Sequence, residues 1–195
     1  MRMFTAVLPP QDVVQDLDEF LAPRREHRDP DRTPLRWTLP ESWHVTLGFM
    51  PHVGDRRLDE LLERLERAGK RRRPFDLRIA GGGAFPDAAA ARVVYAATVG
   101  DPGDLEELRR LATGARAAAT KAGAEVDGGR FRPHVTLARL RRPADVVRWL
   151  RLLDTYESRT WTATELVLVR SHLGEGPRGR PRYEVVERFP LLTEG

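Results

Sequence analysis

The hydrophobic and polar positions of the chain repeat one short pattern. The tetrapeptide His-Val-Thr-Leu occurs at residues 44–47 and again, unchanged, at residues 134–137. Polar and apolar residues alternate in both copies, which is typical of a strand with one buried face. We therefore expect two strands whose valine and leucine face a core, while the histidine and the threonine share the opposite face.

The residues around this repeat predict further strands and helices. The two repeat strands are expected to run to about residue 51 and over residues 130–140. Alternating or clustered apolar residues predict other strands at 1–10, 35–39, 74–79, 92–99, 160–171 and 183–189. Leucine, valine and alanine at helical spacing predict helices at 11–25, 58–69, 105–123 and 144–153. Loops are expected at 27–34 and 172–182, and the glycine-rich stretch 81–86 is expected to be a flexible connector.

The elements follow a similar order around each copy of the repeat. This order predicts an α+β protein with two pseudo-symmetric lobes, each an antiparallel β-sheet with helices on its outer face, and a cleft between the lobes. A length of 195 residues fits one domain. We therefore expect residues 1–195 to form a single domain of two intertwined lobes, with one copy of the repeat in each.

The composition excludes several classes of protein. The chain has no cysteine, which excludes disulfides and thiolate metal sites. No apolar run reaches the length of a membrane-spanning helix, and residues 1–10 lack the apolar region of a signal peptide. We therefore expect a cytoplasmic protein that does not associate with membranes. Our overall interpretation is that it is a monomer.

The basic residues are strongly biased towards arginine. All but two of the 33 basic residues are arginines, the exceptions being Lys70 and Lys121. The forked guanidinium group suits phosphate, although a GC-rich genome would produce the same bias. The net charge is only +4, so the charge by itself is weak evidence for a nucleic-acid partner.

The repeat predicts a pair of catalytic histidines. The chain has only five histidines, so an identical four-residue match around two of them is improbable by chance. If the two strands lie side by side, His44, Thr46, His134 and Thr136 converge on one cleft. Imidazole titrates near pH 6.5, so one histidine can act as general base while the other acts as general acid. The hydroxyls can donate hydrogen bonds to the oxygens of a phosphoryl group, which indicates a phosphoester-cleaving enzyme.

Each of these residues taken singly also has a structural explanation. A lone histidine on a strand is more often structural than catalytic, and threonine is common in strands. A purely structural repeat would place the two His-Thr faces far apart. We expect no metal and no cofactor, because neither repeat histidine has a second histidine, a cysteine or a carboxylate at the spacing of zinc ligands.

Two arginines near the second copy are further candidates for phosphate binding. Arg132 has the same strand parity as His134 and Thr136, so its side chain is expected to face the cleft. Arg139 has the opposite parity unless the strand bulges or ends after Leu137. Either arginine could equally be a solvated surface residue.

Together these residues resemble the 2H phosphoesterases, most closely the RNA 2′,3′-cyclic phosphodiesterases of the 2′-5′ RNA ligase, or LigT-like, family. The duplicated His-x-Thr motif is the specific part of the resemblance. The supporting similarity spans nearly the whole chain and includes residues 2–7, 36–37, 43–49, 83–86, 92–95, 131–139, Ser171, Leu173, Gly179 and Tyr183. The chain departs from the family pattern at residues 50–52, where Leu-Gly-Glu is usual, and at Tyr95, where tryptophan is common.

The resemblance implies a reaction and a role for each motif residue. It implies that His44 is the proton donor, that His134 is the proton acceptor, and that Thr46, Thr136 and Arg139 bind the substrate phosphate. The implied substrate is RNA with a 2′,3′-cyclic phosphate terminus, such as a tRNA fragment or another oligonucleotide, or a small cyclic nucleotide. The product is a 2′-phosphomonoester, formed without a metal, and reversal of the same chemistry gives 2′-5′ ligation. Because the motifs are nearly symmetric, the acid and base roles are interchangeable at this stage.

Two other functions are compatible with the same sequence. The first is a related 2H activity on another small nucleotide cyclic phosphate or on a 2′-5′ linkage. The second is a non-catalytic module that binds RNA ends in the same cleft. A wide basic rim would favour oligonucleotides, a closed pocket would favour nucleotides, and a binding module would show no turnover.

Overall fold

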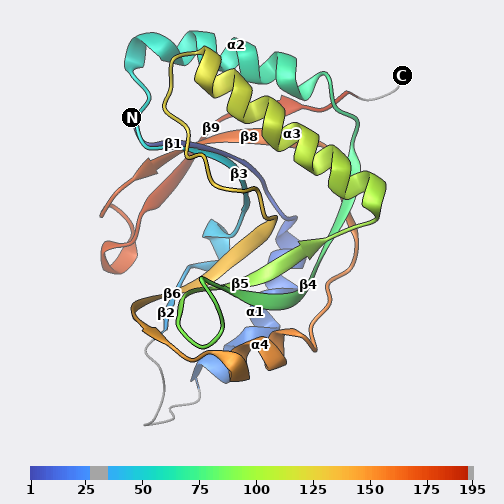
Figure 1. The fold of residues 1–195 in the computed structure, drawn as a ribbon, viewed down its shortest axis with the longest axis vertical. Coiled ribbons are helices and arrows are strands. Elements are labelled where there is room, and N and C mark those ends of the chain that lie inside the picture. Colours follow the sequence, from blue (N-terminus) through green and yellow to red (C-terminus); the bar gives the residue numbers. More distant parts are fainter. Residues whose placement is uncertain (27–34, 193–195) are drawn as a thin grey trace.

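The computed structural model describes residues 1–26 and 35–192 (Figure 1), so the loop predicted at 27–34 lies outside the described residues. The strands are β1 (Met3–Val7), β2 (Arg36–Trp37), β3 (Val45–Met50), β4 (Phe75–Phe85), β5 (Ala91–Val99), β6 (His134–Ala144), β7 (Trp161–Ala163), β8 (Glu165–His172) and β9 (Arg182–Pro190). The helices are α1 (Gln11–Glu26), α2 (Leu58–Gly69), α3 (Pro102–Lys121) and α4 (Val147–Leu153), with short 3₁₀ helices η1 (Pro40–Ser42), η2 (Asp55–Arg57) and η3 (Pro177–Gly179).

The described strands form one curved antiparallel sheet. Its order is β7-β4-β5-β6-β3-β1-β8-β9, and β2 pairs with β6 beside this path. Figure 1 shows the sheet as two arms, with α2 and α3 along the arm that contains β1, β8 and β9, and α1 and α4 near β4, β5 and β6. The predicted α+β class, antiparallel pairing and outer helices are confirmed. The two predicted sheets are arms of one sheet, joined where β3 meets β6.

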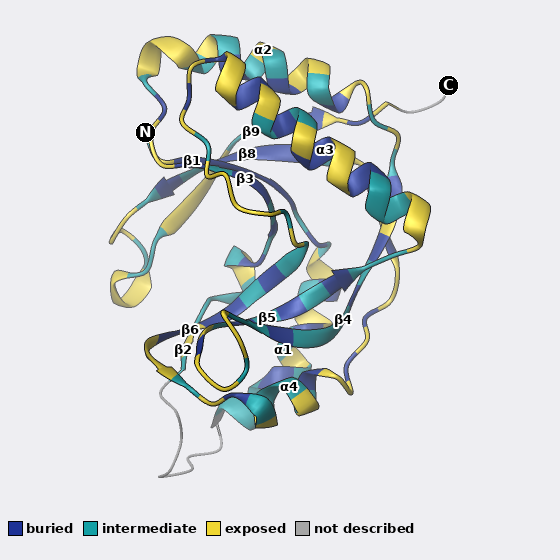
Figure 2. Ribbon diagram, viewed as in Figure 1, coloured by how far each residue is buried: buried dark blue, intermediate teal, exposed yellow. Residues whose placement is uncertain are grey.

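The core lies between the sheet and its helices (Figure 2). The valines and leucines of the repeat, at positions 45, 47, 135 and 137, are all 0% exposed, as their alternation predicted. Leu61 and Leu65 of α2 and Leu108 and Leu111 of α3 are also fully buried, because the apolar stripe of each helix faces inward. The repeat strands therefore have one buried face, which leaves the other face for polar groups.

Several predicted element boundaries differ from the structure. The expected connector at 81–86 belongs largely to β4, which continues through a bulge at which Gly81 adopts a φ of 76°. The expected strand at 160–171 is two strands, since β7 pairs with β4 whereas β8 pairs with β1 and β9. Strand β6 begins at His134 and not at residue 130, because Pro133 has no N–H for the ladder.

None of the helices in the described ranges has the length and apolar character needed to cross a membrane.

Candidate active site

The two copies of the repeat lie next to each other at the centre of the sheet. Val45 of β3 pairs with Val135 of β6 in antiparallel register. Because antiparallel partners run in opposite directions, this register places His44 beside Thr136 and Thr46 beside His134. The structural alternative required the two His-Thr faces to be far apart, whereas the register brings all four polar residues onto one face of the sheet.

Both imidazoles are held by the same local hydrogen bond. The Nδ1 atom of His44 is 2.7 Å from the carbonyl oxygen of Ser42, and that of His134 is 2.6 Å from the carbonyl oxygen of Arg132. A carbonyl oxygen only accepts, so we assign the proton to Nδ1 in both rings. Each Nε2 is then left to accept a proton when the ring is neutral or to donate one when the ring is charged.

Each imidazole is bracketed by two aromatic rings. Phe4 stacks on His44 with ring centroids 4.5 Å apart, and Tyr183 meets the same imidazole edge-on at 5.5 Å. The imidazole of the second motif lies 5.0 Å from the rings of both Phe85 and Tyr95. The four rings therefore pack against the imidazoles on both sides of the cleft. The sequence interpretation missed these brackets, since their members come from four different strands or strand ends.

Burial governs the protonation of the two histidines. Desolvation lowers the pKa of His44 to about 4, opposed by the Ser42 carbonyl and assisted by the charges of His134 and Arg139. The pKa of His134 is also lowered, first by burial and then by the charge of Arg139, against the effect of the Arg132 carbonyl. Both imidazoles are therefore neutral near pH 7 in the free protein.

A bulge in β6 turns Arg139 towards the histidines. Tyr95 of β5 pairs with Thr136, but Val94, the residue before it, pairs with Ala138, so β6 carries one extra residue at this point. The extra residue reverses the strand parity, which was the condition under which Arg139 would face the cleft. The effect of the Arg139 charge on both imidazoles agrees with this placement.

A cavity of about 510 Å³ opens beside the second motif. Thr46 and His134 both line it, which independently places these two residues together. Arg132 lines it as well, with its guanidinium 5.9 Å from the centroid of Phe85. The other lining residues are Phe49, Phe85, Pro86, Arg116, Asp127, Gly129, Arg130 and Phe131. All six predicted site residues thus lie on the same face of the sheet or at its cavity.

Arg116 is a site residue that the sequence interpretation missed. It projects from α3 and donates hydrogen bonds to the carbonyl oxygens of Leu47 and Gly129, at 2.8 Å each. Its guanidinium lies 5.8 Å from the centroid of Phe131, so it joins α3 to the wall of the cavity. Nothing in the local sequence distinguishes it from the other arginines of its helix.

The remaining described histidines do not line this cavity. His172 is 2.7 Å from a carboxylate oxygen of Glu184 in the β8–β9 hairpin, and His52 is exposed. The described residues contain no group of three or more histidine, cysteine, aspartate or glutamate side chains arranged to hold a metal ion.

An active-site face with two histidines and two threonines on paired central strands defines a 2H-type phosphoesterase site. Comparison with known proteins agrees with this class. The model of the 2′-5′ RNA ligase superfamily matches residues 9–175 of the chain. The chain belongs to the 2′-5′ RNA ligase superfamily, and the resemblance seen in the sequence is confirmed.

Several relatives are similar over most of the chain. An RNA 2′,3′-cyclic phosphodiesterase of Thermus thermophilus is 32% identical and covers 100% of this chain and 92% of the relative. Another RNA 2′,3′-cyclic phosphodiesterase, from Aeropyrum pernix, is 33% identical over 78% of this chain and 86% of the relative. The crystal structure of TT0787 of Thermus thermophilus has a TM-score of 0.76 at 31% identity over 100% of both chains. That of Escherichia coli LigT has a TM-score of 0.73 at 24% identity over 98% of both chains, which shows the shared fold.

Proposed function

We propose that this protein opens 2′,3′-cyclic phosphates at the ends of RNA to 2′-phosphomonoesters. The observation that carries the proposal is the crosswise arrangement of the two motifs, in which each imidazole lies beside the threonine of the other strand. A phosphate centred between the strands meets one Nε2 on each side and one hydroxyl from each strand. In-line displacement at phosphorus requires this placement of acid and base. The similarity to RNA 2′,3′-cyclic phosphodiesterases supports the choice of substrate.

In the proposed reaction, His134 takes a proton from water while the water oxygen bonds to phosphorus. The bond between phosphorus and the 3′ oxygen breaks, and protonated His44 gives its proton to that oxygen. The products are a 2′-phosphomonoester and a 3′-hydroxyl, and proton exchange with solvent restores the two rings. The hydroxyls of Thr46 and Thr136 and the guanidinium of Arg139 hold the non-bridging oxygens as their charge increases.

The lowered pKa of His44 sets a condition on this scheme. The free imidazole is neutral near pH 7, so the donor role requires the bound phosphate anion to favour its charged form. Arg132, beside the cavity, adds positive charge for the RNA backbone. Metal is not required by the scheme, because protons and phosphate oxygens are all handled by side chains of this chain.

The same groups catalyse ligation with their roles unchanged, and cleavage of a 2′-5′ linkage is that reaction in reverse, with the roles exchanged. If the 5′-hydroxyl of a second RNA takes the place of water, the cyclic phosphate is converted into a 2′-5′ linkage. One chain supplies every group in the scheme, so we propose that residues 1–195 act as a single monomeric domain. The proposal places the reaction on RNA ends in the cytoplasm.

The test is turnover of an oligonucleotide with a 2′,3′-cyclic phosphate end in excess EDTA. We expect a 2′-phosphate product, and a loss of at least about 10²-fold in kcat for His44→Ala and for His134→Ala. His52→Ala is the matched control, because His52 is an exposed histidine that does not line the cavity. Thermal unfolding of each variant shows whether a loss reflects chemistry or folding.

The outcomes separate the alternatives. Absence of turnover by the unaltered protein, with tight binding of the same RNA end, would replace the enzyme with a binding module. Turnover of nucleoside cyclic phosphates or 2′-5′ linkages, but not of the oligonucleotide, would assign the related 2H activity.

A further inference from the structure

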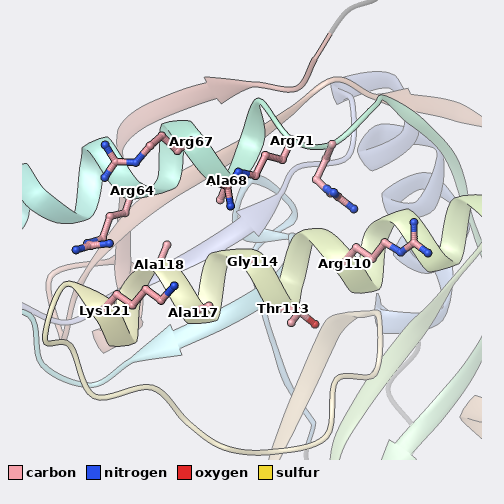
Figure 3. Close-up of a pocket in the computed structure, with 11 residues that line it drawn as sticks. Arg64, Arg67, Ala68, Arg71, Arg110, Thr113, Gly114, Ala117, Ala118 and Lys121 are labelled. Carbon is pink, nitrogen blue, oxygen red and sulfur yellow. The ribbon is translucent and has the colours of Figure 1, made fainter.

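The described part of the chain presents two basic surfaces. One is a groove of about 430 Å³ between α2 and α3, on the outer side of the sheet. Figure 3 shows Arg64, Arg67 and Arg71 along one side of this groove and Arg110 and Lys121 on α3. Ion pairs balance much of its charge, since Arg64 pairs with a glutamate at 2.8 Å and Arg110 with another at 3.1 Å.

The second basic surface lies on the face of the sheet that carries the histidines. Arg36 of β2 and Arg139 of β6 are direct partners in the antiparallel ladder. Directly opposed residues project from the same face of a sheet, so Arg36 shares the face of Arg139. The neighbouring pair, Trp37 and Ala138, projects from the other face, where Ala138 is buried and Trp37 packs on the core.

Within residues 1–26 and 35–192, this arginine pair has no acidic partner. Both side chains are exposed, and neither forms an ion pair or a hydrogen bond with another described residue. Like charges placed directly opposite each other on a sheet destabilise it. An anion bound between the two guanidinium groups would offset that repulsion and would receive charge-assisted hydrogen bonds from both.

The position of the pair relates it to the proposed phosphate site. The charge of Arg139 acts on both imidazoles, whereas Arg36 does not contribute to the pKa of either one. Thr136 lies beside His44, and Arg36 pairs with Arg139, three residues further along β6. One of these three steps is the bulge. At a rise of about 3.3 Å per residue the two sites are roughly 7–10 Å apart. One nucleotide of an RNA strand spans such a separation between its phosphates.

We propose that Arg36, together with Arg139, binds the phosphate on the 5′ side of the terminal nucleotide, so that the site selects RNA ends over nucleoside cyclic phosphates. This proposal rests on the proposed function, because it takes the reacting cyclic phosphate to lie between the two histidines. Arg139 then lies between the two phosphates, and Arg36 contacts only the outer one. Such a contact requires an oligonucleotide or a 5′-phosphorylated nucleotide as substrate.

The experiment compares two substrates with the same terminal base. One is uridine 2′,3′-cyclic phosphate, and the other is a dinucleotide that ends in the same cyclic phosphate. We expect Arg36→Ala to lower the ratio of their kcat/KM values, dinucleotide over mononucleotide, by about 5- to 30-fold. Removal of one phosphate contact should also lower the slope of log KM against log salt by about 0.7 for the dinucleotide. Arg36→Lys keeps the charge without the forked guanidinium group. Its substrate ratio should therefore lie between those of the unaltered protein and Arg36→Ala.

Arg71→Ala is the matched control, since Arg71 is an exposed arginine in the outer groove. It should leave the substrate ratio unchanged. A ratio in Arg36→Ala within twofold of the unaltered protein would overturn the proposal, and a fall in Arg71→Ala would move the RNA path to the α2–α3 groove. If neither substrate is turned over, the proposed function fails separately. In that case the affinities for the two 2′-phosphate products are measured instead, and their ratio, dinucleotide over mononucleotide, tests Arg36 directly.

Discussion

The side-chain hydroxyl of Thr38 lies 2.8 Å from the carbonyl oxygen of Thr136, at the bulge that turns Arg139 towards the cleft. The same hydroxyl is 2.9 Å from the carbonyl oxygen of Leu137, and the Thr38 N–H donates to that oxygen at 2.8 Å. The hydroxyl oxygen of Thr38 also accepts a hydrogen bond from the buried indole N–H of Trp43 at 2.9 Å. Thr38, the residue after β2, therefore holds the bulge, and through the bulge it positions Arg139.

Replacing Thr38 by valine should damage both stability and phosphate binding. The substitution leaves the Trp43 indole N–H buried without an acceptor, which costs about 1–3 kcal/mol of unfolding free energy. Release of the bulge should also lower kcat/KM, and Arg139→Ala should then have a smaller effect than it has in the unaltered protein. Denaturant unfolding and a double-mutant cycle measure the two effects. Thr38→Ser, which keeps the hydroxyl, is the control, and a fully additive cycle would refute the positioning role.

The sequence predicted the parts of this site that depend on period-two alternation. His44, Thr46, His134 and Thr136 follow from the repeat, because a strand pattern fixes which side chains share a face. The face of Arg139 could not be predicted, since a bulge adds a residue without a local sequence signal. The arms of the sheet, the aromatic brackets and Arg36 also needed the structure, because strand pairing joins residues that are far apart in the chain.

The ring of Tyr95, which packs against His134, requires a glycine at position 83. A Cβ atom at this position would lie 2.2 Å from the hydroxyl oxygen of Tyr95, the residue directly opposite on β5. Gly83→Ala should therefore displace the Tyr95 ring from the imidazole, lower the unfolding free energy by about 1–3 kcal/mol and reduce turnover. Thermal unfolding and kcat measure the change, and Gly54→Ala, which has open space around the new methyl, is the control.

A second variant tests whether Gly83→Ala acts through the ring of Tyr95. Removal of the ring by Tyr95→Ala takes away the clash, so adding Gly83→Ala to that variant should cause little further loss. A Gly83→Ala protein as stable and as active as Gly54→Ala would show that the ring moves without consequence for His134.

The lowered histidine pKa values predict a loss of stability in mild acid. Between about pH 4 and the usual value near 6.5, the unfolded chain binds protons that the folded His44 does not, so unfolding free energy falls as the pH is lowered through this window. The slope contributed by one such group reaches about 1.4 kcal/mol per pH unit. Denaturant unfolding between pH 7 and 5 should show a steeper decline in the unaltered protein than in His44→Gln, which does not titrate. Equal slopes would contradict the burial of the imidazole.

The same pKa values predict that kcat and kcat/KM have different pH optima. The reactive form carries one protonated and one neutral histidine, and in the free protein both pKa values are below the usual range, so this form is most abundant in mild acid. The profile of kcat/KM reports the free protein, whereas that of kcat reports the complex. A bound phosphate anion favours the charged imidazole and raises its pKa. The optimum of kcat should therefore lie at higher pH than that of kcat/KM.

Arg139 gives this pH prediction a second test. Its charge lowers the pKa of both imidazoles in the free protein, so Arg139→Ala should move the kcat/KM profile to higher pH. Arg71→Ala, which removes an arginine from the outer groove, should leave the profile in place. Both profiles are measured with the dinucleotide substrate at constant ionic strength, because screening alters the effect of a nearby charge. If the pH optima of kcat and kcat/KM coincide in the unaltered protein, the bound phosphate does not act on the histidine that donates the proton.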